Sequence, residues 1–379
     1  MAVLHKICFI SLFFLLGACA SIPNDAILEN ALSSADKRIK KVMDNIGQYE
    51  IQIRYTQIDR VNDSIIFTDH DFQVNPQNYF YPASTVKFPT AVTTLEKLNG
   101  MDSIDRNFKF YIEGDSVETT FAHNITEIFA ISGNEANNRL IEFLGQDDLN
   151  ERMKRRGVAP IRISHRLSTI NADEVSTKPL VIYYNDTMVT TTKTIINSPP
   201  KPLSLKNIKK GDGYYVEDSL YMKPFDFSLK NYFPIEAQSR LLKRIIFPKA
   251  FPIEEQFDLT SAQHQFLLDA MQALPKSAGY DTEEYYDSYG KFFMFGDWHE
   301  PIPENVKIYN KVGYAYGSLT DCAYIKDTQN NIDFMLIATI LVNKDGIFND
   351  DQYEYDDIGI PFLAQLGREI YALELKRQR

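Results

Sequence analysis

The sequence predicts an α/β (α+β) protein, with an antiparallel sheet flanked by helices and a second, mostly helical subdomain. Two observations support this prediction. A helical pattern and two strand patterns open the chain, and three further strand patterns and a helix close it. Helical patterns dominate the long interval between these two groups. We therefore expect one sheet built from both ends of the chain, with the helical subdomain between them.

The first group begins with a helical pattern. Apolar residues recur at helical spacing over 28–46 and stop at Gly47, where a helix is expected to end. Residues 49–56 then alternate between apolar and polar side chains. Residues 64–68 follow after a turn at Asn62–Asp63, so we expect a hairpin.

The closing group is predicted to contain consecutive antiparallel strands over 307–311, 320–326 and 332–342. A closing helix is expected over 357–376. Two amphipathic helices precede the strands, over 234–247 and 259–274, and Pro275 stops the second. A single domain over 28–379 follows from these patterns. Within this domain, we assign residues 28–70 and 235–379 to the α/β layer. Residues 71–234 are assigned to the helical subdomain.

The composition is that of a well-cored acidic protein. Hydrophobic residues make up 44% of the chain, more than a disordered chain carries. The formal net charge of −11 argues against nucleic acid as a partner, because phosphate binding needs a basic face. The six His residues form no metal-ligand motif, and no Gly-rich phosphate loop occurs. We therefore expect no metal and no cofactor, a monomer, and a surface-loop position for His165.

The N-terminus predicts export and a lipid anchor. The apolar run 7–16 is too short to span a bilayer, so residues 1–18 are interpreted as a signal peptide. The run ends in Leu16-Gly17-Ala18-Cys19, which resembles a bacterial lipoprotein box. Cys19 would then be lipidated and residues 19–27 would form a tether to a membrane leaflet. The predicted location is the cell envelope, facing the periplasm. The alternative is an ordinary signal peptide with an incidental Cys.

The most informative local pattern is Ser84 followed by Lys87, in Tyr81-Pro82-Ala83-Ser84-Thr85-Val86-Lys87. Residues three apart share one face of a helix, and a helix is expected to run on through Lys97. A helix N-terminus favours a developing anion, and a buried Lys amine with a lowered pKa can take the Ser proton. Alone this pair is a weak signal, since a capping Ser beside a solvated Lys has the same spacing.

Two further triplets strengthen the signal, because Ser132-Gly133-Asn134 and Lys311-Val312-Gly313 follow in that order. Together the three patterns are similar to the S-x-x-K, S-D-N and K-T-G signature, with Gly133 in place of Asp and Val312 in place of Thr. The run from Lys311 to Ala323 also resembles the family's K-T-G strand and the turn and strand after it. The chain thus resembles the penicillin-recognising S-x-x-K superfamily and is most similar to its class A β-lactamase branch. This resemblance places a catalytic cleft between the sheet and the helical subdomain.

The resemblance implies a serine hydrolase that forms an acyl-enzyme. Ser84 would attack a carbonyl, Lys87 would accept the Ser84 proton, and Ser132 would relay a proton to the leaving nitrogen. The implied substrate is a small molecule, a β-lactam or a peptidoglycan-like compound.

Four more residues are implied to bind substrate. Asn134 would orient Lys87 and the amide side chain of the substrate, and Lys311 would pair with the substrate carboxylate. Gly313 would let the strand approach closely. The backbone N–H groups of Ser84 and Tyr314 would form an oxyanion hole, in which one donor is worth about 3–4 kcal/mol.

The chain differs from the family at the acid that activates the deacylating water. Class A enzymes use a Glu in an Arg-x-Glu-x-x-Leu-Asn run, and the nearest stretch here, 166–174, has Ser168 at that place. Asp173 and Glu174 are alternative acids, although a solvated loop acid is the favoured interpretation of each. We therefore expect the acyl-enzyme to form faster than it is hydrolysed.

Two inserts lengthen the interval before Lys311, at 181–210 and 276–301. The first begins as a predicted hairpin over 181–195, and the second contains the only Trp, Trp298. The inserts either wall the cleft or pack on the outside, and the sequence leaves these alternatives even.

Three functions are therefore compared. The favoured one is class A β-lactamase-like hydrolysis of β-lactam amides. A penicillin-binding-type D,D-peptidase or an esterase with the same Ser-Lys pair is the first alternative. The second is a non-catalytic lipoprotein that binds cell-wall fragments or a partner protein. The Ser-Lys nucleophile argues against this last function, because a pure binding module has no need of it.

Overall fold

The computed structural model describes residues 26–62, 64–101, 103–185 and 187–377. The predicted signal peptide and Cys19 lie outside the described residues. In the described part, no helix combines the length and apolarity needed to cross a bilayer.

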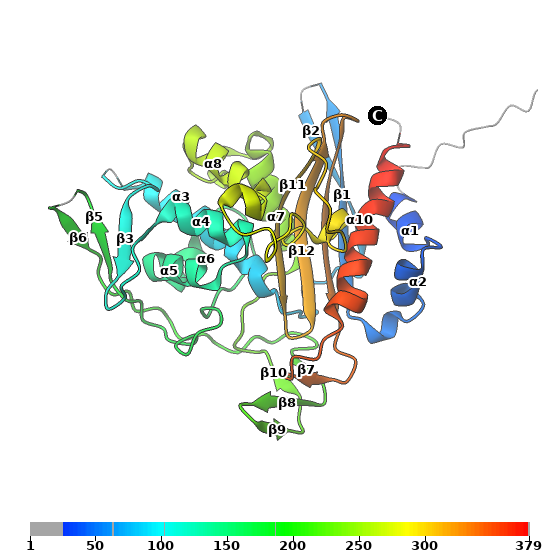
Figure 1. Cartoon of the computed structure of the whole chain (residues 1–379), viewed down its shortest axis with the longest axis horizontal. Helices are drawn as coiled ribbons and strands as arrows, with labels where there is room; N and C mark the ends of the chain where they lie inside the picture. The colour runs from blue at the N-terminus through cyan, green and yellow to red at the C-terminus, as the bar shows by residue number, and fades with distance from the viewer. Residues whose placement is uncertain (1–25, 63, 102, 186, 378–379) are drawn as a thin grey trace, which may run out of the picture.

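A five-stranded antiparallel sheet stands at the centre of the molecule, in the order β11-β12-β13-β1-β2 (Figure 1). Its strands are β1 (Gln52–Val61), β2 (Ser64–Phe72), β11 (Val306–Ala315), β12 (Ser318–Asp327) and β13 (Ile332–Leu341). Because β1 pairs with β13, the two ends of the chain meet in one sheet. The predicted fold class is confirmed.

Helices from the two ends of the chain pack beside this sheet. They are α1 (Ile27–Leu32), α2 (Lys37–Met43) and α10 (Ile360–Glu374), and α10 follows a π-helical turn at Tyr355–Gly359. Apolar residues of α1, α2 and α10 share a buried cluster with β11, β12 and β13. Another helix, α7 (Ile235–Ile246), contacts β1, β12 and β13, and its apolar residues belong to a separate cluster.

The single helix predicted over 28–46 is wrong, because the chain turns between α1 and α2. Asp36 has extended backbone angles, and its side chain accepts a hydrogen bond from the backbone N–H of Arg38. This N-cap satisfies one of the free N–H groups at a helix start, so a second helix begins here. The apolar periodicity alone did not reveal this cap.

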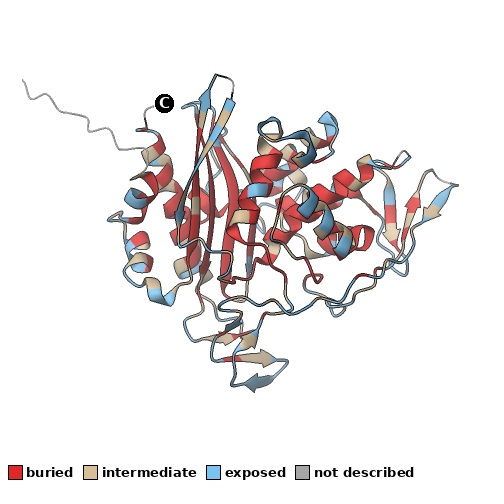
Figure 2. Cartoon of the chain, turned by 180° about the vertical axis from the view of Figure 1, so that it is seen from behind, coloured by how far each residue is buried: buried red, intermediate tan, exposed pale blue. Residues whose placement is uncertain are grey.

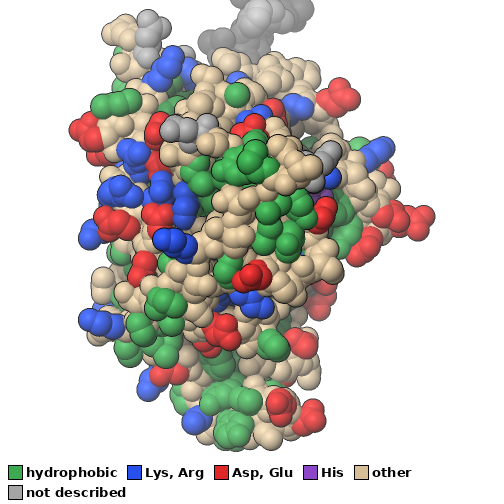
Figure 3. Space-filling view, turned by 90° about the vertical axis from the view of Figure 1, so that its left-hand side faces the viewer, with side chains coloured by type: hydrophobic (Ala, Val, Ile, Leu, Met, Phe, Trp, Pro, Cys, Tyr) green, Lys and Arg blue, Asp and Glu red, His purple; other side chains and the backbone are tan. Residues whose placement is uncertain are grey.

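The helical subdomain is organised around α3 (Lys87–Asn99), which is buried along nearly its whole length. Around it lie α4 (Phe121–Ala130), α5 (Asn134–Leu144), α6 (Gln146–Arg155) and α8 (Ser261–Gln272). Figure 2 shows that burial is concentrated in the sheet and in these central helices. On the outer face of this subdomain, Lys and Arg side chains lie among Asp and Glu side chains (Figure 3).

Small strands form the rest of the described structure. The hairpin predicted over 181–195 is present as β5 (Leu180–Tyr183) and β6 (Val189–Thr191). They join β3 (Lys109–Ile112) and β4 (Thr119–Thr120) in a separate four-stranded sheet. Five more short strands lie beneath the central sheet in Figure 1, namely β7 (Lys209–Lys210), β8 (Gly213–Val216), β9 (Ser219–Tyr221), β10 (Phe225–Asp226) and β14 (Ile347–Phe348). The insert 276–301 contains the short helix α9 (Phe292–Phe295).

Candidate active site

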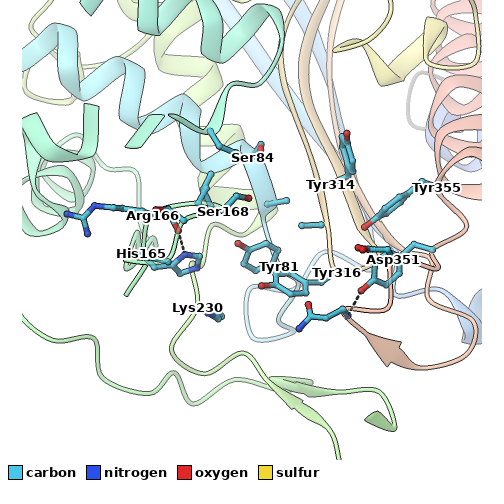
Figure 4. A pocket seen from close by; sticks show the side chains of 18 residues that line it. Tyr81, Ser84, His165, Arg166, Ser168, Lys230, Tyr314, Tyr316, Asp351 and Tyr355 are labelled. Carbon is cyan, nitrogen blue, oxygen red and sulfur yellow. Dashed lines mark hydrogen bonds between the residues drawn. The ribbon is translucent and has the colours of Figure 1, made fainter. Parts of the chain in front are cut away.

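Ser84 lies where the predicted nucleophile helix begins. It belongs to a 3-10 turn, Ala83–Val86, that runs directly into α3. Ala83 adopts a left-handed backbone conformation with φ of 46°, which is unusual for a residue other than glycine. Ser84 is partly buried and lines a cavity of about 480 Å³. Figure 4 shows Ser84 between the loop that carries Ser168 and the strand that carries Tyr314.

Lys87 is completely buried behind this turn. Its Nζ donates hydrogen bonds to Asn134 Oδ1 at 2.7 Å, to Ser132 Oγ at 3.3 Å and to the Ser132 carbonyl. Burial lowers the pKa of Lys87 well below its usual value, and the positive charge of Lys311 lowers it further. An amine with a lowered pKa can accept a proton from a neighbouring hydroxyl.

Ser132 lies between two buried lysines. Lys311 Nζ donates to Ser132 Oγ at 2.8 Å and to the Val312 carbonyl at 2.8 Å. Burial lowers the pKa of Lys311 to about 7. Ser132 has a φ of 60° in the connection between α4 and α5, and Asn134 begins α5. The fold thus gathers Ser132, Asn134 and Lys311 around Lys87, although they are far apart in sequence.

Gly313 holds β11 against the turn of the candidate nucleophile. A Cβ atom at this position would lie 2.6 Å from Ser84 N and 2.9 Å from Pro82 O, closer than real Cβ contacts. Gly313 is therefore required for the approach of the sheet edge to Ser84. The next residue, Tyr314, is 48% exposed and lines the cavity. The chemical roles of these residues stay predictions.

A buried polar network behind β11 was not predicted from the sequence. Asp321 Oδ1 accepts from Asn310 Nδ2 at 2.8 Å, and Lys291 Nζ donates to Asn310 Oδ1 at 2.7 Å. Burial lowers the pKa of Lys291 to about 7 and raises that of Asp321 to about 6. Lys291 comes from the insert 276–301, and no local pattern around it indicates a buried cation. The charges of these two residues also act on the pKa of Lys311: Asp321 raises it and Lys291 lowers it.

The loop 166–174 is drawn together by one buried ion pair. Arg166 Nε and Nη2 donate to the two carboxylate oxygens of Glu142 at 2.6 and 2.9 Å. Arg166 Nη1 also donates to the Glu174 carbonyl at 2.7 Å. Ser168 is exposed and lines the cavity. Asp173 and Glu174 are exposed and are not among the lining residues, although Asp173 lies 3.8 Å from the ammonium of Lys230, which is one of them. The loop therefore places no carboxylate on the cavity wall.

His165 is not the surface residue that we expected. It is only 5% exposed, and its ring stacks on that of Tyr81 with a centroid distance of 6.2 Å. Its Nδ1 lies 2.6 Å from the Arg166 carbonyl, an arrangement that makes Nδ1 the donor. Burial lowers the pKa of His165 to about 4, so the ring is neutral at pH 7.

Aromatic side chains line much of the cavity, a feature that the sequence analysis missed. The tyrosines among the lining residues are Tyr81, Tyr314, Tyr316, Tyr353 and Tyr355. They come from three distant segments, so no sequence window shows them together. The insert 276–301 adds Tyr289, which lies close enough to Tyr314 for a hydrogen bond between the two side chains. This contact favours the interpretation that the second insert walls the cleft.

The described residues include no group of three or more His, Cys, Asp or Glu side chains that could hold a metal ion.

Comparisons with known proteins bear on the family and on the fold. Residues 34–197 match the model of the β-lactamase enzyme family, a segment that includes Ser84, Lys87, Ser132 and Asn134 but ends before Lys311. No curated protein matches the chain in sequence.

Solved structures extend the similarity over nearly the whole chain. A class A β-lactamase representative from Bacteroides cellulosilyticus superposes with a TM-score of 0.53 at 14% identity, covering 92% of this chain and 97% of that one. L2, crystallised with relebactam, gives a TM-score of 0.52 at 13% identity and covers 92% and 99%. A β-lactamase from Sphaerobacter thermophilus gives 0.50 at 11% identity and covers 91% and 95%. The chain therefore has the class A β-lactamase fold.

Proposed function

We propose that the chain is a β-lactamase-like hydrolase that forms an acyl-enzyme at Ser84 with a β-lactam amide. Its fold and the family model that residues 34–197 match support this proposal. One observation carries this proposal. The Lys87 amine is buried, has a lowered pKa and is held by Asn134 and Ser132, one turn from Ser84. A buried base beside a hydroxyl at the start of a helix is what serine acylation requires.

The proposed reaction begins at Ser84 and then uses the hydrogen-bonded group of Lys87, Ser132 and Lys311. Ser84 Oγ attacks the amide carbonyl while its proton passes to Lys87 Nζ. The C–N bond then breaks, and the leaving nitrogen takes a proton from Ser132 Oγ, which Lys87 reprotonates. Lys311, when charged, attracts the substrate carboxylate. The products of this half-reaction are a Ser84 ester and a free amine within the opened ring.

Intact mass after brief exposure to a chromogenic cephalosporin tests this proposal. Wild-type protein is expected to gain a covalent adduct, and Ser84→Ala is expected to gain none. Ser219→Ala, a change of an exposed serine on β9, serves as the matched control and should label like wild type. Labelling that persists in Ser84→Ala would disprove the assignment.

A second candidate, a penicillin-binding-type D,D-peptidase or an esterase, is supported by Ser168. Because the loop 166–174 brings no carboxylate to the cavity wall, a water over the Ser84 ester has no evident base from that loop. General-base assistance contributes about 10²–10⁴-fold, so deacylation is expected to be slow. A long-lived adduct together with release of D-alanine from a D-Ala-D-Ala peptide supports this candidate. A burst followed by rapid steady turnover supports the β-lactamase instead.

The third candidate, a non-catalytic binding lipoprotein, makes the opposite prediction. It predicts no adduct with either substrate and saturable binding of cell-wall fragments that is unchanged in Ser84→Ala.

We also propose that the protein acts as a monomer tethered to the cell envelope by a lipid on Cys19. The Leu-Gly-Ala-Cys sequence and the polar residues after it support this location. Expressed in a bacterium, the protein should fractionate with membranes, and Cys19→Ser should release it or block its processing. Equal solubility of the two forms would indicate an ordinary signal peptide.

A further inference from the structure

The place of the missing Asp side chain in the second motif is occupied by another acid. The motif reads Ser132-Gly133-Asn134, and the residue replaced by Gly133 is an Asp in the similar family. A Cβ atom on Gly133 would lie 2.2 Å from Glu127 Oε1 and 2.8 Å from Glu127 Cδ and Cγ. The side chain of Glu127 therefore fills the space that any larger residue at 133 would need.

The last turn of α4 fixes Glu127 in this position. Its carbonyl accepts hydrogen bonds from the N–H groups of Ile131 at 3.1 Å and Gly133 at 3.4 Å, so the chain folds back over it before α5. The Glu127 side chain is 18% exposed, and its Oε2 lies 3.5 Å from Nε2 of His123. Glu127 thus enters the site from a helix rather than from the loop 166–174.

Glu127 also acts on the charge of the candidate base. Two charged groups act on the Lys87 amine: Lys311, which lowers its pKa, and Glu127, which raises it. When Lys87 takes the Ser84 proton, two ammonium groups face Ser132 Oγ from both sides. A nearby carboxylate offsets this charge as it forms, and such preorganised charges stabilise a transition state.

We propose that Glu127 is the positioning carboxylate of the Ser84–Lys87–Ser132 proton relay, and that residue 133 is a glycine because Glu127 occupies its side-chain space. The proposal rests on the proposed function in one respect, the nucleophilic role of Ser84. Its electrostatic part concerns Lys87 in the free protein and can be tested separately.

Glu127→Gln, a nearly isosteric change, tests the charge. Without the carboxylate, Lys87 should hold its proton less tightly. The acid limb of the acylation rate should then move to lower pH, and the plateau rate should fall by about tenfold, because the forming ammonium lacks its counter-charge. Glu135→Gln is the matched control, since Glu135 is an exposed acid in the first turn of α5. A wild-type acid limb and plateau in Glu127→Gln would overturn the proposal.

An NMR titration of the Lys87 side chain separates this inference from the proposed function. Glu127→Gln should lower the Lys87 titration midpoint in the unliganded protein, whether or not a β-lactam acylates Ser84. An unchanged midpoint would overturn the electrostatic role. If the wild-type protein forms no adduct, that result counts against the proposed function. The shift of the Lys87 titration midpoint then still tests the role of Glu127.

An exchange of the two positions tests the steric part. Gly133→Asp alone should acylate poorly, because its side chain collides with Glu127. Glu127→Ala alone should lose the carboxylate but open the space. The double variant should acylate at least fivefold faster than either single variant, since the acid returns at position 133. Melting curves should show that all three remain folded. A folded double variant no faster than Glu127→Ala would count against the exchange.

Discussion

At the scale of single residues, the site contains three buried lysines whose hydrogen bonds go to neutral groups rather than to carboxylates. Lys87, Lys291 and Lys311 are all at most 2% exposed, and burial lowers the pKa of each. Their hydrogen bonds go to neutral acceptors, namely carbonyls, Ser132 Oγ, Asn134 and Asn310. Neutral acceptors satisfy an amine without fixing its charge, so Lys291 and Lys311, whose pKa values are about 7, can change charge near pH 7.

Lys311 gives the first prediction, on the pH dependence of substrate binding. Its pKa is about 7, so it loses its charge as the pH rises above 7. KM for a carboxylate-bearing β-lactam should then rise, approaching tenfold per pH unit. Steady-state kinetics between pH 6 and 9 measure this. The methyl ester of the same compound is the control, because it lacks the carboxylate and should show a flat KM. A parallel rise for the ester would rule out Lys311 as the carboxylate partner.

Gly313 gives a second prediction at this scale. In Gly313→Ala, the new Cβ must push β11 away from the backbone of Ser84, since the two would be 2.6 Å apart. A displacement of about 1 Å near the reacting atoms costs about 10²-fold in rate. Acylation should slow by that factor while the protein stays folded. Gly47→Ala is the control, because a Cβ at Gly47 meets nothing within 4 Å. Acylation at the wild-type rate in Gly313→Ala would contradict the close approach.

At the scale of elements, the site lies where three of them meet: the turn before α3, the edge strand β11 and the loop 166–174. The strand and the turn are held together by backbone contact at Gly313. The loop is held by Arg166, whose guanidinium forms an ion pair with Glu142 and contacts the carbonyls of Asn171, Glu174 and Ser176. Asn138 holds it too, because its side chain makes two hydrogen bonds with the Leu167 backbone.

This ion pair gives a prediction on stability. Arg166 and Glu142 side chains are 1% and 7% exposed, so Glu142→Gln leaves a buried guanidinium without its counter-charge. Loss of one partner of a buried pair costs about 3–5 kcal/mol. Urea unfolding should show this loss. Glu151→Gln breaks the exposed pair with Arg155 and should cost less than about 0.5 kcal/mol. Similar costs for the two variants would refute the structural role of Arg166.

The strands near the end of the chain could be predicted from the sequence. The helix cap at Asp36 and the burial of His165 could not. The strands β11, β12 and β13 were predicted as three consecutive strands, and their observed bounds extend the predicted ranges by one to four residues at most of their ends. The predicted helix over 28–46 failed because Asp36 caps a second helix inside it. His165 was misplaced because burial of a loop depends on its neighbours, here the ring of Tyr81. The contact of His165 with Tyr81 joins residues distant in sequence, whereas the Asp36 cap is local and is not marked by the apolar periodicity.

At the scale of the whole molecule, the sheet takes part in two buried apolar clusters. One joins it to α1, α2 and α10, and the other joins it to α7 and to the helical subdomain. Three motifs in order were enough to predict Ser84, Lys87, Ser132, Asn134 and Lys311 as one group, because their residue types carry the chemistry. The sequence could not predict Glu127, Lys291 or Asp321. Each is an ordinary charged residue in its own segment, and only the assembled fold brings it near a lysine of the site.

The buried charges together predict how stability depends on pH. The lysines of the site have lowered pKa values in the folded protein, about 7 for Lys291 and Lys311, against 10.5 for an ordinary lysine. Between about pH 7 and 10, the unfolded chain therefore binds more protons than the folded one. The free energy of unfolding then rises with pH, by up to about 1.4 kcal/mol per pH unit for each such lysine.

Other titratable groups limit the rise in the free energy of unfolding to the range between about pH 7 and 10. Asp321 has a raised pKa of about 6, so its contribution falls as the pH rises from about 4 to 6. His165, with a pKa lowered to about 4, contributes in the opposite direction over nearly the same range. Buried tyrosines with raised pKa values, such as Tyr81 and Tyr324, lower stability above about pH 10, where the unfolded chain loses their protons.

Urea unfolding at pH 6.5, 8.0 and 9.5 tests this balance. The free energy of unfolding should increase across the three values, and the increase should be smaller in Lys291→Met, which removes one of the contributing groups. At pH 6.5, burial of the charged Lys291 costs the most. Lys291→Met should therefore have a higher free energy of unfolding than the wild-type protein at this pH. A flat or falling stability between pH 7 and 9.5 would mean that these lysines stay charged in the folded protein. Lys87 would then be unable to act as the base that the proposed acylation requires.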